Sequence, residues 1–437
     1  MRCLALAFTV AIPCAALAGP DIIPGSITSV TNYGELGGTR AVAAGLAMCN
    51  IGDANLTINA ITNQHAVITQ NLYRVESDGV TQIGMSWVTH TFCALQQSLC
   101  GTCTPAQVTC TELGVGCSDV MGGGLAGSQS NLSSRTDVDA SVAIFSFPFT
   151  PAAGNSLFKR LQYSTDDVNP ATHPGARYFV ELVTLAPDDA AAGNGANGAA
   201  YREVTIRPDG GLGSFLGDTV RELPAIYAWQ DIDPTVQISF VDIPGDGRVY
   251  VASKASDLGN GSWRYAYTVM NLNSHESVRG ISVPSAGGGG SNLAFAGIDY
   301  HSGDTVDSTD WAGLSTGTTV SWETATPASD PDANAIRWAT GYSFSFESTA
   351  APADGTVELE TYRSQTVLNI GAVTPAAGSV CVGDCDMSGA IDFGDLVEML
   401  FHFGLDFVPP ECDPTEDAQA DFNDLVATLF LFGDCPD

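Results

Sequence analysis

The spacing of the cysteines constrains the fold of this chain more than any other feature. Six cysteines lie between Cys49 and Cys117, and four more lie between Cys381 and Cys435. No cysteine lies between Cys117 and Cys381, so each even group can close its own disulfides in an oxidising compartment. The chain is therefore expected to contain two separately cross-linked parts. The spacing leaves the pairing within each group open.

The N-terminus has the pattern of a secretory signal peptide. It begins with Met1-Arg2, continues through a short apolar stretch and reaches Ala16-Leu17-Ala18, a small-x-small cleavage site before Gly19. Residues 1–18 are predicted to be removed, and with them the two remaining cysteines. The apolar core is too short for the roughly 20 residues that span a bilayer, and no later run is longer. The sequence predicts a secreted protein, extracellular or at the cell surface, without membrane insertion.

The net charge narrows the choice of partners. The chain carries 49 acidic and 16 basic residues, a formal charge of -33. Such a surface repels nucleic-acid phosphates and anionic lipid. Divalent cations remain compatible with it. We therefore expect no nucleic-acid partner.

Most of the chain reads as short strands punctuated by Gly, Asn, Asp, Ser and Pro. Alternation of apolar and polar residues, as in 236–240, is typical of a half-buried strand. Strands are predicted at 67–75, 178–185, 236–241, 249–253, 265–272, 342–346 and 357–362. This pattern favours a mostly β fold with β-sandwich-like domains.

Composition suggests how the chain divides into domains. The expected units are a Cys-containing β-rich domain at 19–222, a second, sandwich-like β-rich domain at 223–373, a linker at 374–380 and a small module at 381–437. The Asp/Ala/Gly/Asn-rich stretch 188–200 and the Gly-rich stretch 285–291 are expected to be surface loops within the β-rich part.

The last module contains an internal repeat. Residues 392–404 match residues 421–433 at nine of thirteen positions. Each copy has a helix-like apolar stretch that ends at a glycine in the position of a C-cap. The module is therefore expected to be α-helical.

The segment before the first of these helices has the residue pattern of a twelve-residue EF-hand loop. Gly389 stands at position six, where the loop turns sharply, and Ile391 stands at position eight, where an apolar residue packs between paired loops. Calcium prefers six to eight hard oxygen ligands. Oxygens fall at positions one, three, five, seven (a backbone carbonyl), nine and twelve, which are Asp384, Asp386, Ser388, Ala390, Asp392 and Asp395.

The second copy has a poorer loop. Ala418 stands where glycine belongs, Thr415 replaces a carboxylate or amide, and Pro414 stiffens the entry. This loop is expected either to bind calcium weakly or to imitate the bound shape. The aligned ligand positions are Asp413, Thr415, Asp417, Asp421 and Asp424.

A duplicated calcium loop, each copy followed by one helix at the end of a secreted chain, resembles a dockerin. Asp395 and Asp424 at position twelve, and the Asp-Leu opening of each helix, belong to that resemblance. It implies a module that folds on calcium and docks onto a cohesin-like or other extracellular protein. The chain departs from cellulosomal dockerins at Phe393-Gly394 and Phe422-Asn423, where that family carries small hydroxyl residues facing cohesin.

Other motifs favour structural interpretations. Cys100 and Cys103 could form a redox or zinc half-site, but four neighbouring cysteines favour disulfides. The acidic stretch 299–310 is interpreted as a solvated loop, with a second calcium site as the alternative. The histidines are expected in loops or in the core, and the tryptophans in the core instead of on a sugar-stacking platform: His65, His90, His173, His275 and His301, and Trp263, Trp311, Trp322 and Trp338.

No catalytic motif is convincing. Ser156 and Lys159 fit Ser-x-x-Lys without the accompanying motifs, and residues 313–317 fit Gly-x-Ser-x-Gly in a turn that does not lead into a helix. Two functions remain open. The first is an extracellular binding or scaffold protein anchored through its C-terminus. The alternative is a secreted hydrolase acting on polysaccharide.

Overall fold

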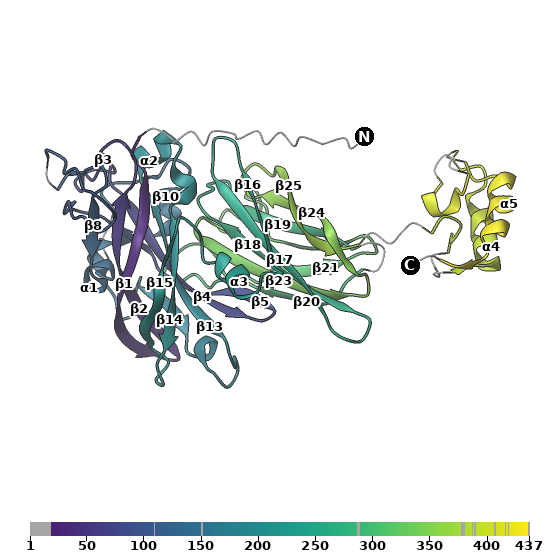
Figure 1. Cartoon of the computed structure of the whole chain (residues 1–437), viewed down its shortest axis with the longest axis horizontal. Helices are drawn as coiled ribbons and strands as arrows, with labels where there is room; N and C mark the ends of the chain where they lie inside the picture. Colours follow the sequence, from purple (N-terminus) through teal and green to yellow (C-terminus); the bar gives the residue numbers. More distant parts are fainter. Residues whose placement is uncertain are drawn as a thin grey trace, which may run out of the picture.

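The protein is mostly β, with antiparallel sheets and a small helical C-terminal part, as predicted (Figure 1). The computed structural model describes residues 19–108, 110–149, 152–285, 289–376, 381–386, 388, 390–405, 408–415, 417 and 419–435. The predicted signal peptide at 1–18, and part of the predicted linker and of the 285–291 loop, lie outside the described residues.

The first sheet contains eleven strands, all paired antiparallel. Eight of them follow one another in the order β1 (Ile22–Leu36), β2 (Thr39–Asn50), β12 (Leu161–Ser164), β5 (Gly79–Met85), β4 (Val67–Glu76), β13 (Arg177–Leu185), β14 (Ala199–Ile206) and β15 (Leu212–Arg221). Three short strands pair beside this path: β6 (Val88–His90), β8 (Ser118–Met121) and β9 (Leu132–Ser133).

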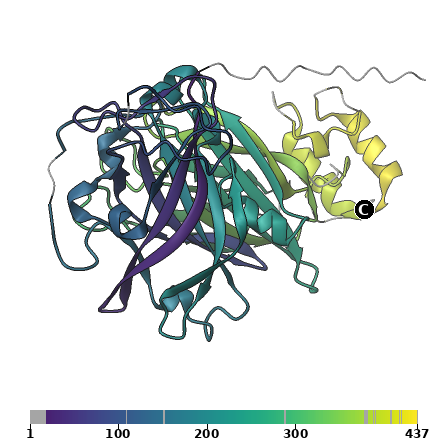
Figure 2. The same ribbon diagram turned by 60° about the vertical axis from the view of Figure 1, so that its left-hand side comes forward.

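This sheet curls until its two edges meet. The Ile27 amide in β1 donates to Thr219 Oγ1 in β15 at 2.9 Å, and Arg202 Nη1 donates to the Ile27 carbonyl at 2.7 Å. The curled sheet encloses a core that includes Leu46 and Val180, both fully buried. Figure 2 shows this sheet, purple to teal, beside the green strands of the next two sheets.

Two five-stranded antiparallel sheets follow. One has the order β16 (Gln237–Asp242), β17 (Arg248–Asp257), β18 (Trp263–Asn271), β23 (Thr340–Ser348) and β20 (Ser291–Ala296). The other has the order β21 (Ala312–Ser315), β22 (Thr319–Glu323), β19 (Val278–Pro284), β24 (Pro352–Thr361) and β25 (Val367–Pro375). One aromatic-rich core, with Tyr267 and Phe346 from the first and Trp322 and Leu359 from the second, joins the two sheets.

A third core lies between the first sheet and the second β-rich part. Strand β4 is buried on both faces: Ile68 and Leu72 point into the curled sheet, whereas Val67, Tyr73 and Val75 point outward. Successive side chains of a strand alternate in direction, so a strand buried on both faces shows no apolar-polar alternation. The outward residues pack against side chains of the later sheets and of α3 (Tyr227–Ile232), among them Trp229, Tyr250, Met270 and Trp338.

A buried hydrogen-bond network also crosses this junction. Arg135 is 1% exposed and donates to the carbonyl of Ala339 at 2.7 Å and to Asn71 Oδ1 at 2.7 Å. Asn71 in turn donates to Glu181 Oε1 at 2.7 Å. Burial raises the pKa of Glu181 to about 7, while hydrogen bonds and the Arg135 charge act in the opposite direction. The two β-rich parts are thus joined by polar as well as apolar contacts.

The disulfides close within the two predicted groups, which confirms the prediction of two sets. The early bridges are Cys49–Cys100, Cys93–Cys110 and Cys103–Cys117, and the late bridges are Cys381–Cys435 and Cys385–Cys412. Cys100 and Cys103 therefore bond to different partners, so they form neither a redox pair nor a zinc half-site. Five disulfides are compatible with an extracellular protein.

Each of the seven predicted strands coincides with an observed strand. The last strand of the first sheet ends at Arg221 and the first strand of the next sheet begins at Gln237, so the predicted boundary at 222/223 falls in the connection between them. The stretch 188–200 was expected to be a loop, but it contains most of a short helix, α2 (Pro187–Ala192). Pro187 at the first helical position and Gly193 in the left-handed region, φ 78°, explain where α2 begins and ends.

The remaining elements are short. They are β3 (Leu56–Thr57), β7 (Glu112–Leu113), α1 (Gly123–Ala126), β10 (Val138–Asp139), β11 (Ile144–Phe145), β26 (Ala390–Ile391), α4 (Phe393–His402), α5 (Phe422–Leu431) and β27 (Gly433–Asp434). Among the described residues, no helix has the length and apolar composition needed to cross a bilayer.

Candidate functional site

The first predicted calcium loop brings three carboxylates together in front of α4. One oxygen each from Asp384, Asp386 and Asp395 lies within 4.8 Å of the other two. Asp384 and Asp395 are buried, and Asp386 is exposed. These are positions one, three and twelve of the predicted loop. Hard carboxylate oxygens at this separation fit the donor set of Ca²⁺.

Backbone amides hold these carboxylates in place. The Asp395 carboxylate accepts from the amide of Asp386 at 3.0 Å and from the amide of Asp392 at 2.6 Å. Asp384 Oδ1 accepts from the amide of Ser388 at 2.9 Å. Hydrogen bonds from the backbone amides of the loop therefore hold its carboxylates in position.

The other predicted ligands of this loop are engaged locally. Ser388 Oγ donates to the carbonyl of Ala390 at 3.0 Å. The Asp392 side chain caps α4 by accepting from the amide of Gly394 at 2.6 Å. Three of the four predicted aspartates of this loop, Asp384, Asp386 and Asp395, thus lie in one group, and Gly389 lies outside the described residues.

The pKa values in this loop move in opposite directions. Burial, together with the negative charges of Asp386 and Asp384, raises the pKa of Asp395, while amide hydrogen bonds oppose the shift. Hydrogen bonds, above all with Ser388, lower the pKa of Asp386. Residues 381–437 contain fourteen acidic residues and no Lys or Arg, so no cation of the module offsets this repulsion.

The second loop repeats the first with an offset of 29 residues. Its carboxylate group is Asp413, Asp417 and Asp424, at positions one, five and twelve, again with one oxygen each within 4.8 Å of the others. Asp417 N donates to Asp413 Oδ1 at 3.1 Å, as its counterpart does in the first loop. The Asp424 carboxylate accepts from the amides of Thr415 at 3.1 Å and Asp421 at 2.9 Å.

The second loop differs at position three. Thr415 Oγ1 donates to Asp424 Oδ1 at 2.8 Å, where the first loop has the carboxylate of Asp386. This hydroxyl therefore already occupies one of the oxygens predicted to bind metal. Asp421 caps α5 at the amide of Asn423, 2.6 Å away. Ala418 lies outside the described residues.

Two disulfides fix the loops relative to each other. Cys385, the second residue of the first loop, is bonded to Cys412, which directly precedes the second loop. Cys381–Cys435 joins the two ends of the module. Both cysteine-containing clusters near these bridges use sulfurs that are already oxidised, so they offer no thiolate for a soft metal such as zinc.

The two helices present matching apolar side chains to solvent. Their buried sides meet at Met399 and Thr428, each fully buried. The exposed side chains pair at the same 29-residue offset and have similar exposed fractions: Phe393 72% and Phe422 72%, Val397 42% and Val426 36%, Leu400 55% and Leu429 53%, Phe401 70% and Phe430 86%, Phe403 38% and Phe432 45%. We call these ten residues the paired apolar surface. Exposed large apolar side chains gathered on a small module are typical of protein interaction sites.

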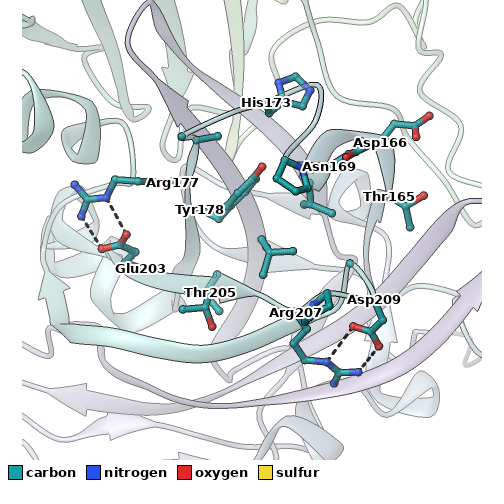
Figure 3. A pocket seen from close by; sticks show the side chains of 18 of the residues that line it. Thr165, Asp166, Asn169, His173, Arg177, Tyr178, Glu203, Thr205, Arg207 and Asp209 are labelled. Atoms are coloured by element: carbon teal, nitrogen blue, oxygen red, sulfur yellow. Dashed lines mark hydrogen bonds and ion pairs between the residues drawn. The ribbon is translucent and has the colours of Figure 1, made fainter.

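A cleft of about 660 Å³ lies on the first sheet (Figure 3). Its charged residues are largely paired with one another. Arg177 donates to both carboxylate oxygens of Glu203, at 2.8 and 2.6 Å, and Arg207 pairs with Asp209 in the same manner. The arrangement gives the cleft a polar rim of two Arg–carboxylate pairs.

The core contains a histidine chain that the sequence did not reveal. His65 Nε2 lies 2.9 Å from His90 Nδ1, and His90 Nε2 lies 2.8 Å from Ser133 Oγ. Both rings are 1% exposed and Ser133 is 5% exposed, which confirms the core interpretation for these histidines. Burial lowers the pKa of His90 to about 3, and nearby His65 and Lys159 contribute. The sequence could not predict this contact, because 25 residues separate His65 from His90.

The remaining motifs also take structural roles. Trp311, Trp322 and Trp338 are 3% exposed or less, as expected for core residues. Ser315 ends β21 and leads into β22, so the Gly-x-Ser-x-Gly match lies in a strand-turn-strand connection. Asp304 in the acidic 299–310 stretch accepts from Ser134 Oγ at 2.6 Å.

Comparisons with known proteins do not identify a family. No family model and no curated protein matches the sequence. Among solved structures, a serine-rich repeat adhesion glycoprotein from Streptococcus agalactiae overlaps 81% of this chain and 97% of its own, at 9% identity and a TM-score of 0.20. An exo-chitosanase from Amycolatopsis orientalis overlaps 76% of this chain and 25% of its own, at 10% identity and a TM-score of 0.16. Neither overlap establishes a shared fold.

Proposed function

We propose that this chain is a secreted, calcium-binding extracellular protein. In this proposal the β-domains, sandwich-like in the second β-rich part, act as binding or scaffold modules. A dockerin-like C-terminus anchors them to a cohesin-like or other extracellular partner. The observation that carries the proposal is the pair of carboxylate groups, Asp384/Asp386/Asp395 and Asp413/Asp417/Asp424, set in equivalent backbone frames within a segment that has no Lys or Arg.

The paired apolar surface supports the anchoring role. Its phenylalanines lie on the solvent side of both helices, where a monomeric domain gains nothing from them. A partner that covered these side chains would bury a large apolar area, and such residues often dominate binding energy. Phe393 and Phe422 make this surface more apolar than the hydroxyl-bearing one of cellulosomal dockerins, so we expect a partner with an apolar recess.

Calcium titration of the purified mature chain tests the proposal. We expect a heat of binding in isothermal titration calorimetry that disappears when Asp384 and Asp413 are both changed to Ala. The variant Asp242→Ala removes one exposed carboxylate of β16, outside the module. It is the charge-matched control for the single variants Asp384→Ala and Asp413→Ala. No calcium heat in the unaltered protein, after chelation and dialysis, would contradict the proposal.

A polysaccharide panel tests the role of the β-domains. Retention of the protein on a polysaccharide without turnover supports a binding module. Turnover of any member of the panel would replace the binding-module assignment with the alternative, a secreted hydrolase.

A further inference from the structure

A cavity of about 330 Å³ lies where the two β-rich parts meet, away from the C-terminal module. The first part contributes the segment around Arg135–Val138, and the second contributes Arg337, Trp338 and Arg363 among others. Pockets that hold small molecules have volumes of about 300–1,000 Å³. The cavity is therefore large enough for one monosaccharide-sized ligand.

The cavity concentrates positive charge in an acidic protein. Only 16 of the 437 residues are basic, yet three arginines line this one cavity. Arg135 is engaged by the buried network described above. Among the described residues, Arg337 and Arg363 have no carboxylate within ion-pair distance, whereas Arg74, Arg177 and most other arginines of the sheets do.

Arg337 is the more constrained of the two. It is 8% exposed, and its hydrogen bonds run from Nη2 to the carbonyls of Pro331 at 3.3 Å and Ala333 at 3.2 Å. Its buried Nε has no hydrogen-bond partner among the described residues. The guanidinium lies 4.3 Å from the ring centre of Tyr362. A buried guanidinium without an anion is costly, because neither neutral carbonyls nor a ring balances its full charge.

Arg363 adds a second, exposed guanidinium to the same cavity. Its Nε donates to the carbonyl of His275 at 2.7 Å. Burial of part of its side chain and the neighbouring charge of Arg337 both lower the pKa of Arg363, and the more distant carboxylates of Glu276 and Asp139 offset the shift only in part. Two like charges that disfavour each other are relieved by an anion placed between them, and a planar carboxylate matches the fork of a guanidinium.

The acids of the cavity restrict which anion fits. Asp137 and Asp332 also line it, and both are exposed. A carboxylate can accept hydrogen bonds from hydroxyl groups, but it repels a second anionic group. The net charge of -33 likewise disfavours a long polyanion. These constraints favour a ligand with one carboxylate on a hydroxyl-rich frame.

We infer that this cavity binds a small acidic sugar, with its carboxylate held by Arg337 and Arg363 and its hydroxyls directed toward Asp137 and Asp332. The inference rests on the proposed role of the β-domains as binding modules and specifies a ligand class for them.

Titration of the full mature chain with D-glucuronate, followed by calorimetry and by total tryptophan fluorescence, tests this inference. D-glucose is the neutral match, and sulfate is the anion without a sugar frame. We expect glucuronate to bind at least tenfold more tightly than glucose or sulfate. Arg337→Gln and Arg363→Gln should each weaken glucuronate binding at least tenfold, and Arg207→Gln, which removes one exposed arginine elsewhere, should leave it unchanged.

Several results would overturn the inference. They are an absence of glucuronate binding at millimolar concentration, equal binding of glucose or sulfate, and unaltered affinity in Arg363→Gln. Arg363 is exposed, so its variant keeps the test decisive even where Arg337→Gln fails to fold. Failure on the polysaccharide panel with retained glucuronate binding would contradict the polysaccharide role and leave the cavity assignment intact.

Discussion

The β-rich parts and the C-terminal module use opposite means of holding a chain together. Three apolar cores run through the β-rich parts, and Trp229, Trp322 and Tyr267 are among their fully buried side chains. Among its described residues, the module has a small buried cluster of Cys385, Met399 and Cys412, with Val408 and Leu425 partly buried against it. The phenylalanines of the paired apolar surface are exposed, and two disulfides cross-link the module.

The difference follows from size. A chain of several hundred residues buries enough apolar surface to fold on its cores, whereas a segment of about 60 residues seldom does and relies on cross-links or metal. The module therefore exposes the apolar side chains that the β-rich parts would bury. The comparison predicts that substitutions of buried residues lower the stability of the β-rich parts, and that removal of calcium lowers the stability of the module.

The largest effect is expected from Arg135→Met. This change leaves Asn71 and Glu181 buried without their cationic partner, so the free energy of unfolding of the β-rich parts should fall by about 3–5 kcal/mol. Denaturant unfolding followed by tryptophan fluorescence measures it, and Arg207→Met is the exposed control. Two separate transitions, with only one of them shifted, would show that the junction does not couple the β-rich parts.

Removal of calcium should affect the module alone. Without metal the clustered carboxylates repel one another, so amides in residues 396–403 and 425–432 should exchange at least 100-fold faster in chelator. Amides of β4 and β13 should be unchanged. Hydrogen exchange with mass spectrometry measures both regions in one experiment. Unchanged protection of the two helices would mean that disulfides and helix packing suffice.

Within the module, the two loops should differ in calcium affinity. Asp384→Ala is expected to weaken binding more than tenfold, and Asp413→Ala much less, because Thr415 supplies a hydroxyl where the first loop has a carboxylate. Calorimetry on both variants ranks the loops. Equal losses would indicate that the loops are equivalent despite their different residues at position three.

The smallest effect concerns a carboxyl buried in the β-rich part. Burial raises the pKa of Asp189 to about 7, opposed by a hydrogen bond from the Ile22 amide. The folded protein thus keeps a proton that the unfolded chain releases near pH 4, and stability is lost as the pH rises from about 4 to about 7. Asp189→Asn should therefore raise the free energy of unfolding at pH 8 and leave it almost unchanged at pH 4.

Denaturant unfolding of both proteins at the two pH values measures the effect of Asp189→Asn. An equal gain at pH 4 and pH 8 would show that the carboxyl charge is not the cause. Glu181, whose pKa is also raised to about 7, contributes pH dependence in the same direction.

Strands could be predicted from the sequence where a short run of residues carried the pattern of a strand by itself. Strands such as β16 and β23 have alternating residues or aromatic clusters that indicate a pleated segment. Strands β1 and β2 gave no such signal. The first contains Pro24 and Gly34, and its pairing with β2 shifts register three times, while β2 is rich in alanine. Register shifts break the two-residue period on which the prediction depends.

The candidate sites also differ in whether their residues lie close together in the sequence. The carboxylate groups of the module come from single loops of twelve residues, so spacing alone could indicate them. The cavity joins Arg135 to Arg337, and the histidine chain joins His65 to Ser133. No local pattern in the sequence reports contacts between residues so far apart in the chain. Only the packing of one sheet on another brings them together.

The bridge between Cys381 and Cys435 also determines how the protein can be cut. It closes nearly the whole module into a covalent ring. A protease that cleaves one peptide bond anywhere between these two cysteines leaves both fragments attached to each other. A single cleavage can therefore separate intact β-rich parts from the module only in the short segment that leads into the ring.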